Sequence, residues 1–120
     1  MKETIDTITQ WHKETFPETG LPGQLIKFAE EMNEFDVALN SGQDALSELA
    51  DMIIVAAGIG RFDVLFASAF VQFTYMEASD VGFDMTELWE AVQKKMEKNR
   101  KRVWNKTGNG TYHHENGIED

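Results

Sequence analysis

The chain has 120 residues, a formal net charge of −10 from 21 acidic and 11 basic residues, and no cysteine. This length is that of one domain, and the lack of cysteine excludes disulfides, zinc-thiolate sites and thiol nucleophiles. The negative charge disfavours a nucleic acid polymer or an anionic membrane surface as a partner, because both carry charge of the same sign.

The N-terminus carries no apolar signal segment, and no apolar run is as long as a membrane span. We therefore expect a cytoplasmic protein that does not enter a membrane. Hydrophobic residues make up 42% of the chain, which is enough for a compact core. We expect one all-α domain over residues 1–104, followed by a polar C-terminal tail over residues 105–120, where glycine, asparagine and threonine are frequent.

Apolar residues recur at helical spacing from Lys2 to Thr15, which predicts a first short helix. Prolines and glycines between residues 17 and 23 then interrupt the pattern. From Gln24 to Asn40 the apolar positions advance by alternating steps of three and four, which predicts the clearest helix in the chain. The stripe predicted on this helix comprises Leu25, Phe28, Met32, Phe35 and Leu39.

A third helix is predicted to begin after Asp44, which offers an N-cap, and to end at about Gly58 or Gly60. Because its connection to the second helix is short, the two should be antiparallel neighbours. The segment from Met52 to Ala57 is apolar on every side, and a helix tolerates this pattern only when protein surrounds it. We therefore expect the third helix to be central.

Further helices are predicted over Val64 to Ala78 and over Met85 to Val103, and the last becomes strongly basic towards its end. Strand-like alternation and internal repeats are too weak to compete with this pattern. The sequence therefore predicts an all-α fold, a bundle of four to five helices. Because residues 52–73 carry more apolar surface than one small bundle hides, we also expect a homo-oligomer.

Two groups of carboxylates lie on the second and third predicted helices. Glu31 and Glu34 are three residues apart, as are Glu48 and Asp51, so each pair shares one edge of its helix. In an antiparallel hairpin the two pairs face each other, and their repulsion is costly unless protons or a cation compensate it. Glu30 points away from the apolar stripe, so we leave it out of the ligand set.

A hard divalent cation with oxygen ligands is the natural counter-charge for these acids. Mg²⁺, with Mn²⁺ as an alternative, fits better than Zn²⁺ because no nitrogen or sulfur ligand accompanies them. A glutamate-rich stretch taken alone is more often a solvated helix face. Asp51 argues against that simpler explanation, because it adjoins the segment that is apolar on every side.

The sequence Glu30-Glu31-Met32-Asn33-Glu34, a gap of 13 residues (35–47), and then Glu48-Leu49-Ala50-Asp51 resembles a known signature. It is similar to the EExxE…ExxD pattern of MazG-like nucleotide pyrophosphohydrolases, in the all-α NTP pyrophosphatase superfamily. The segment Lys95–Trp104 looks like the Lys-Met…Asn…Arg…Trp segment of phage and bacterial dATP/dGTP diphosphohydrolases related to MazZ. The resemblance covers about Trp11 to Trp104, and the apolar segment Val64–Ala78 is longer than is usual in this family.

The resemblance implies an enzyme that hydrolyses a nucleoside triphosphate, here a purine dNTP, to the monophosphate and pyrophosphate. Glu31, Glu34, Glu48 and Asp51 would hold Mg²⁺, with Glu31 and Glu34 as catalytic residues and Glu34 as the acceptor of a proton from the attacking water. The acidity of the chain is compatible with this substrate, because bound Mg²⁺ screens the phosphates and is itself attracted to carboxylates.

Lys95, Asn99 and Arg102 are spaced by four and three residues, so they share one helix edge and could grip an elongated triphosphate. The alternative is that the basic residues only stabilise the C-terminal end of this helix through the helix dipole and bind no ligand. Two other functions stay open. A ferritin-like di-metal bundle needs a histidine three residues after a glutamate, and none occurs in this sequence. A non-catalytic helical interaction protein would carry the same acids as solubilising surface groups.

Overall fold

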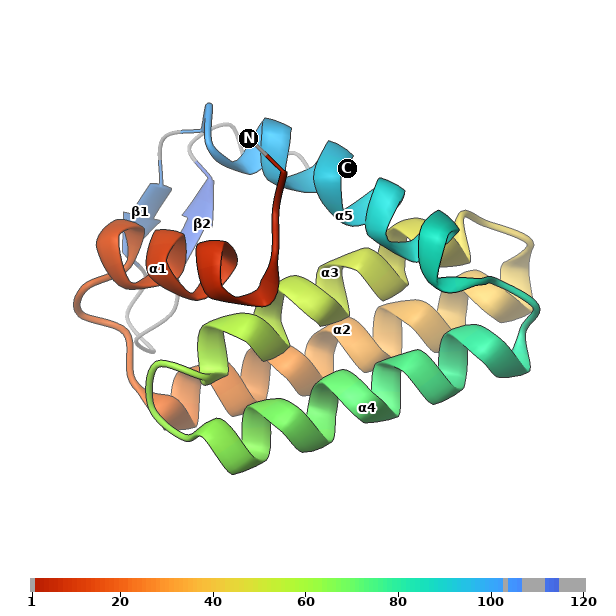
Figure 1. The fold of residues 1–120 in the computed structure, drawn as a ribbon, viewed down its shortest axis with the longest axis horizontal. Coiled ribbons are helices and arrows are strands. Elements are labelled where there is room, and N and C mark those ends of the chain that lie inside the picture. The colour runs from red at the N-terminus through yellow and green to blue at the C-terminus, as the bar shows by residue number, and fades with distance from the viewer. Residues whose placement is uncertain (1, 103, 107–111, 115–120) are drawn as a thin grey trace.

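The computed structural model describes residues 2–102, 104–106 and 112–114 (Figure 1). Over these residues the chain forms five α-helices and two short β-strands. The helices are α1 (Ile5–Thr15), α2 (Leu21–Ser41), α3 (Ala45–Ile59), α4 (Val64–Asp80) and α5 (Met85–Asn99), and the strands are β1 (Trp104–Lys106) and β2 (Tyr112–His114). The predicted helical bundle is thus confirmed, with the two strands as an addition to it.

Helix α3 is the centre of the fold. It contacts α1, α2, α4 and α5, and its residues from Met52 to Ile59 are all buried. The prediction from the all-round apolar segment is therefore confirmed. In Figure 1, α1 and α5 lie on one side of α3, whereas α2 and α4 run side by side on the other. The rings of Phe28 on α2 and Phe70 on α4 stack at a centroid distance of 4.5 Å, which joins these two helices directly.

The helix ends follow local capping chemistry. The side chain of Asp44 accepts a hydrogen bond from the backbone N–H of Ser47, as expected of an N-cap. Helix α2 begins at Leu21 rather than at the predicted Gln24, because Pro22 lies in its first turn, where a missing N–H costs nothing. Helix α5 ends at Asn99, four residues before the predicted Val103, where the chain turns towards β1.

Strands β1 and β2 pair in an antiparallel ribbon in which Trp104 lies opposite His114. The sequence predicted only a polar tail here, because strands of three residues are too short to show a recognisable alternation. The Trp104 ring packs edge-on against Phe16, with 5.1 Å between ring centroids, and so ties the chain after α5 to the end of α1. The remaining residues of the predicted tail lie outside the described part of the chain.

The N-terminal segment is fixed to α5 by a buried acid. Two guanidinium nitrogens of Arg100, Nε and Nη2, donate to the two carboxylate oxygens of Glu3 at 2.7 and 2.9 Å, and the hydroxyl of Thr7 donates to the same carboxylate. These charge-assisted bonds hold the pKa of Glu3 below its usual value, in spite of its burial. The amide of Gln93 exchanges hydrogen bonds with the backbone of Glu3, so α5 is held at two points.

A buried histidine joins α1 to α3. Because Arg61 can only donate, its Nη1 at 3.2 Å makes Nδ1 of His12 an acceptor, and Nε2–H then donates to Oε1 of Gln24 at 3.0 Å. Burial, aided by the charge of Arg61, lowers the pKa of His12 to about 4, so the ring is neutral. A Cβ added at Gly58 would lie 2.4 Å from the ring, so this close approach requires glycine.

Several large apolar side chains stay exposed on α2 and α4. Ile26 and Val37 on α2 are 51% and 53% exposed, and Val64, Leu65 and Met76 on α4 are 73%, 82% and 65% exposed. Monomeric proteins rarely leave so many large apolar groups on neighbouring elements in water. None of the helices in the described residues is both long and apolar enough to cross a membrane.

Gly58→Ala should destabilise the protein by about 1–3 kcal/mol, because the added methyl overlaps the His12 ring in a packed interior. Denaturant unfolding of four chains measures this effect: the original chain, each single variant and the double variant His12→Ala/Gly58→Ala. Once the ring is absent, the added methyl should be tolerated. An equal cost of Gly58→Ala in both backgrounds would contradict the clash as its cause.

Candidate metal centre

The turn between α2 and α3 places the two acidic edges beside each other. Helix α2 ends at Ser41, and Gly42 follows with φ of 72°, the left-handed conformation that glycine adopts without strain. Helix α3 begins only three residues later, at Ala45. The chain therefore reverses at once, and α2 and α3 pack along a shared seam.

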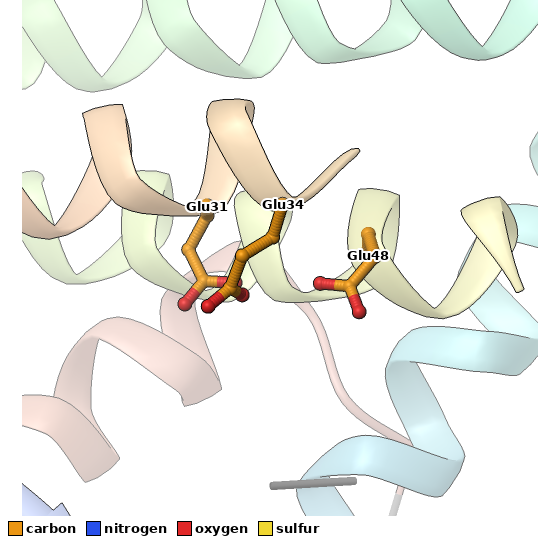
Figure 2. A group of neighbouring side chains, drawn as sticks. All are labelled: Glu31, Glu34 and Glu48. Atoms are coloured by element: carbon orange, nitrogen blue, oxygen red, sulfur yellow. The ribbon is translucent and has the colours of Figure 1, made fainter. Parts of the chain in front are cut away.

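Three of the four predicted ligands meet at this seam. One carboxylate oxygen from each of Glu31, Glu34 and Glu48 lies within 4.8 Å of the other two. Figure 2 shows Glu31 and Glu34 reaching from α2, and Glu48 from α3, to the same side of the two helices. The prediction that the two edges converge is therefore confirmed for these three residues. Glu30 is exposed, as predicted.

Two oxygens of this glutamate cluster are buried without a hydrogen-bond partner among the described residues: Oε2 of Glu31 and Oε2 of Glu48. Only 5% of Glu31 is exposed. Its other oxygen, Oε1, lies 3.4 Å from the ammonium of Lys27 one turn earlier on α2. Buried carboxylate oxygens are costly when they lack a partner. Among the described residues, a proton shared with Glu34 or a bound cation would reduce this cost.

Burial and mutual repulsion make the glutamate cluster hard to ionise. Burial, and then the charge of Asp51, raise the pKa of Glu31 to about 9, although Lys27 opposes the shift. The same two causes, in the same order, raise the pKa of Glu48 to about 7. At neutral pH and without a cation, Glu31 is therefore held mainly as the neutral acid. A bound cation would favour the ionised form of both groups.

Asp51 lies beside the glutamate cluster rather than within it. Its Oδ2 is 3.2 Å from the ammonium of Lys95 on α5, and its side chain is 26% exposed. The expectation that Asp51 is the acid enclosed by apolar groups is wrong, because the buried apolar residues follow it along α3 while Asp51 itself faces α5. The most buried acid of this site is instead Glu31, whose Oε2 has no hydrogen-bond partner among the described residues. Asp51 still belongs to the same electrostatic site, because it raises the pKa of Glu31 and Glu48.

The structure gives the three residues predicted to bind substrate different partners. Lys95 lies beside Asp51 and is 7% exposed. Arg102 instead donates to Oδ1 of Asn99 at 3.0 Å, and the indole N–H of Trp104 donates to the backbone carbonyl of Asn99 at 3.2 Å. Asn99 therefore bonds to Arg102 and to Trp104 at the start of β1, whereas Lys95 forms an ion pair with Asp51.

A groove of about 410 Å³ opens between the start of α3 and α5. Its lining combines acids with three lysines of α5: Asp44, Leu46, Ser47, Glu87, Glu90, Ala91, Lys94, Lys95 and Lys98. Lys95 lines this groove and also pairs with Asp51, whereas Glu31, Glu34 and Glu48 are not among its lining residues. The volume of the groove is within the range of small-molecule sites.

Sequence reasoning missed two kinds of residue. Lys27 lies four residues before Glu31, and this spacing alone could have identified it as a helix-surface partner. Lys94 and Lys98 belong to the basic stretch of α5, but no sequence pattern indicated that they line a groove with the start of α3.

Comparison of the chain with models of known protein families, with curated proteins and with solved structures gives no match. The function must therefore be inferred from the geometry of the site. The likeness of its acidic motifs to MazG-like enzymes stays a prediction.

Stability without metal should fall as the pH rises from about 5 to 9. The pKa of Glu31 is near 4.5 in the unfolded chain and about 9 in the folded protein, so the folded state binds the extra proton throughout this window. Glu31 alone contributes a slope of at most about 1.4 kcal/mol per pH unit. Thermal unfolding in a chelator measures it. Glu31→Gln should flatten the profile, whereas Glu30→Gln, an exposed neighbour, should not. A wild-type profile that is flat between pH 5 and 9 would contradict the prediction.

Proposed function

We propose that the protein is a Mg²⁺-dependent nucleoside triphosphate pyrophosphohydrolase, which converts a nucleoside triphosphate to the monophosphate and pyrophosphate. One observation carries the proposal: three glutamates, with two buried oxygens that have no hydrogen-bond partner among the described residues, lie near Lys95, which lines a groove of mixed charge. The buried oxygens favour a cation. The three lysines of the groove could bind an anion, although three acids line the groove as well. A metal-bound polyphosphate combines both.

The chemistry of the donors selects the ion. Glu31, Glu34 and Glu48 offer only carboxylate oxygens, which suits a hard cation such as Mg²⁺, or Mn²⁺ in its place. The ion would give the buried Oε2 atoms of Glu31 and Glu48 the partner that no described residue gives them. When bound, the ion neutralises charge on phosphate oxygens and lowers the pKa of a water molecule.

The residues of the chain supply the remaining functions. Glu34 is more exposed than Glu31, so it is the member of the cluster best placed to accept a proton from an attacking water. In the proposed step the water oxygen forms a new bond to the α-phosphorus. The bond from the α-phosphorus to the oxygen that bridges it to the β-phosphate breaks, and pyrophosphate leaves. Lys94, Lys95 and Lys98 would attract the phosphate oxygens into the groove.

The finer assignment rests on the resemblance of the sequence alone. The similarity of Lys95–Trp104 to the MazZ-related dATP/dGTP diphosphohydrolases supports a purine dNTP as the substrate. The cytoplasm, where nucleotide pools are found, is the compartment that this function requires.

We further propose that the enzyme works as a homodimer or a homotetramer. The support is the set of exposed apolar side chains on α2 and α4, including Leu65 and Val64 at the start of α4. Because the same helix α2 carries Glu31 and Glu34, association through its outer face would also stiffen the helix that holds the site. A non-catalytic interaction protein would use this apolar face as well, and only activity separates the two functions.

A pyrophosphate-release assay across canonical and modified triphosphates tests the proposed reaction. We expect Mg²⁺-dependent release of pyrophosphate, with the highest rate on a purine dNTP. Glu34→Gln should lower kcat by about 100-fold or more, because it removes a proton acceptor and a metal ligand together. Glu30→Gln is the matched control on the outer face of the same helix, and it should retain activity within about twofold.

Release of orthophosphate alone would point to a different bond being cleaved. No hydrolysis of any triphosphate with either Mg²⁺ or Mn²⁺ would contradict the proposal and favour the interaction protein.

A further inference from the structure

The ion pair between Lys95 of α5 and Asp51 of α3 contains a buried lysine. Lys95 is 7% exposed, which is rare for a lysine unless a partner compensates its charge. Its ammonium donates to Oδ2 of Asp51 at 3.2 Å. The two residues lie 44 positions apart in the chain, so tertiary packing, and not helix periodicity, brings this charge to Asp51.

The ammonium of Lys95 acts on the same site as the proposed metal. Lys95 lowers the pKa of Glu48, while Asp51 raises the pKa of both Glu48 and Glu31, so all four charges interact. A divalent cation at the glutamate cluster would repel the ammonium and attract the carboxylate of Asp51. One carboxylate therefore has two competing cationic partners.

We propose that Lys95 is an exchangeable counter-ion: it neutralises Asp51 in the metal-free protein, and a divalent cation displaces it and takes Asp51 as a further ligand. This inference rests on the metal centre of the proposed function, but it concerns metal binding alone and requires no nucleotide. The exchange makes Asp51 a ligand of the loaded protein even though it pairs with Lys95 in the structure.

The surroundings allow Lys95 to move. Its side chain lines the groove between α3 and α5, so an ammonium that leaves Asp51 has a polar, open space to enter. A lysine is suited to such a role because its flexible stem carries a compact charge. The backbone of α5 need not shift, since Glu3 holds it through Arg100 and Gln93.

Lys27 differs from Lys95 in a way that sharpens the inference. It lies 3.4 Å from Oε1 of Glu31, whereas Oε2 of the same carboxylate is buried and has no hydrogen-bond partner. A cation can therefore bind Glu31 through Oε2 while Lys27 stays in place. The cation would therefore displace Lys95 from Asp51, while Lys27 would stay beside Glu31.

Titration with Mn²⁺ alone, followed by electron paramagnetic resonance or calorimetry, tests the exchange. Lys95→Met keeps the length of the side chain and removes the competing charge, so it should tighten Mn²⁺ binding by about tenfold. Lys101→Met is the matched control, because it removes the same charge from an exposed position just after α5 to which no role is assigned. It should change the affinity by less than about twofold. Equal affinities of Lys95→Met and the original protein would overturn the proposal.

A double variant separates exchange from simple electrostatic repulsion. Asp51→Asn should weaken Mn²⁺ binding because it removes a ligand. If Lys95 acts by occupying Asp51, the variant Asp51→Asn/Lys95→Met should bind as weakly as Asp51→Asn. If the double variant instead regains the affinity of the original protein, Lys95 and Asp51 stay paired beside the metal, and the proposal is wrong.

Thermal unfolding checks that the variants fold and gives a second measure of Mn²⁺ binding. Lys95→Met should unfold at a lower temperature in a chelator, because the ammonium that pairs with Asp51 is then missing beside the glutamate cluster. Mn²⁺ should raise the Tm of this variant more than it raises that of the original protein. Lys95→Gln serves in its place if Lys95→Met does not fold. An equal rise in Tm for variant and original protein would overturn the exchange. These measurements are independent of pyrophosphate release, so the two proposals can fail separately.

Discussion

The position of the site depends on one constraint, the burial of Glu31 within an apolar stripe. Phe28, Glu31 and Phe35 are spaced by three and four residues on α2, and all three are buried. Helix α2 cannot rotate to expose the carboxyl group without also exposing both aromatic rings, each of which would lose a large apolar burial. The packing of the seam therefore forces an acid into the interior, and the chemistry of the site follows from that.

The elements around the seam are held by polar contacts that lie outside it. Arg100 and Gln93 bind the N-terminal segment to α5, and the neutral His12 ring lies between Gln24 of α2 and Arg61 after α3. The side chains of these residues have hydrogen-bond partners within the protein, whereas two buried oxygens of the glutamate cluster have none among the described residues. This is the pattern expected where a ligand supplies the missing partner.

Sequence periodicity predicted the helices but misplaced the buried face of α2. The predicted stripe included Met32 and Leu39, which are 37% and 42% exposed, while Glu31 and Ala38 are buried instead. The spacing of apolar residues predicts that α2 has a buried stripe, but it does not give the centre of that stripe. The packing of α3 and α4 against α2 determines which side chains of α2 are buried. The convergence of the acids was predictable from spacing and a short turn. The pair of Lys95 with Asp51 was not, because it depends on how α5 packs against α3.

The charges at the seam show why protons, lysines and a divalent cation can compete there. Four acids, Glu31, Glu34, Glu48 and Asp51, stand against the lysines at positions 27 and 95, so full ionisation leaves two negative charges. The raised pKa of Glu31 and Glu48 means that protons reduce this excess in the metal-free protein. A divalent cation adds two positive charges to this site, and its binding would release those protons. Metal affinity should therefore rise with pH over the same window in which metal-free stability falls, since one set of carboxylates governs both.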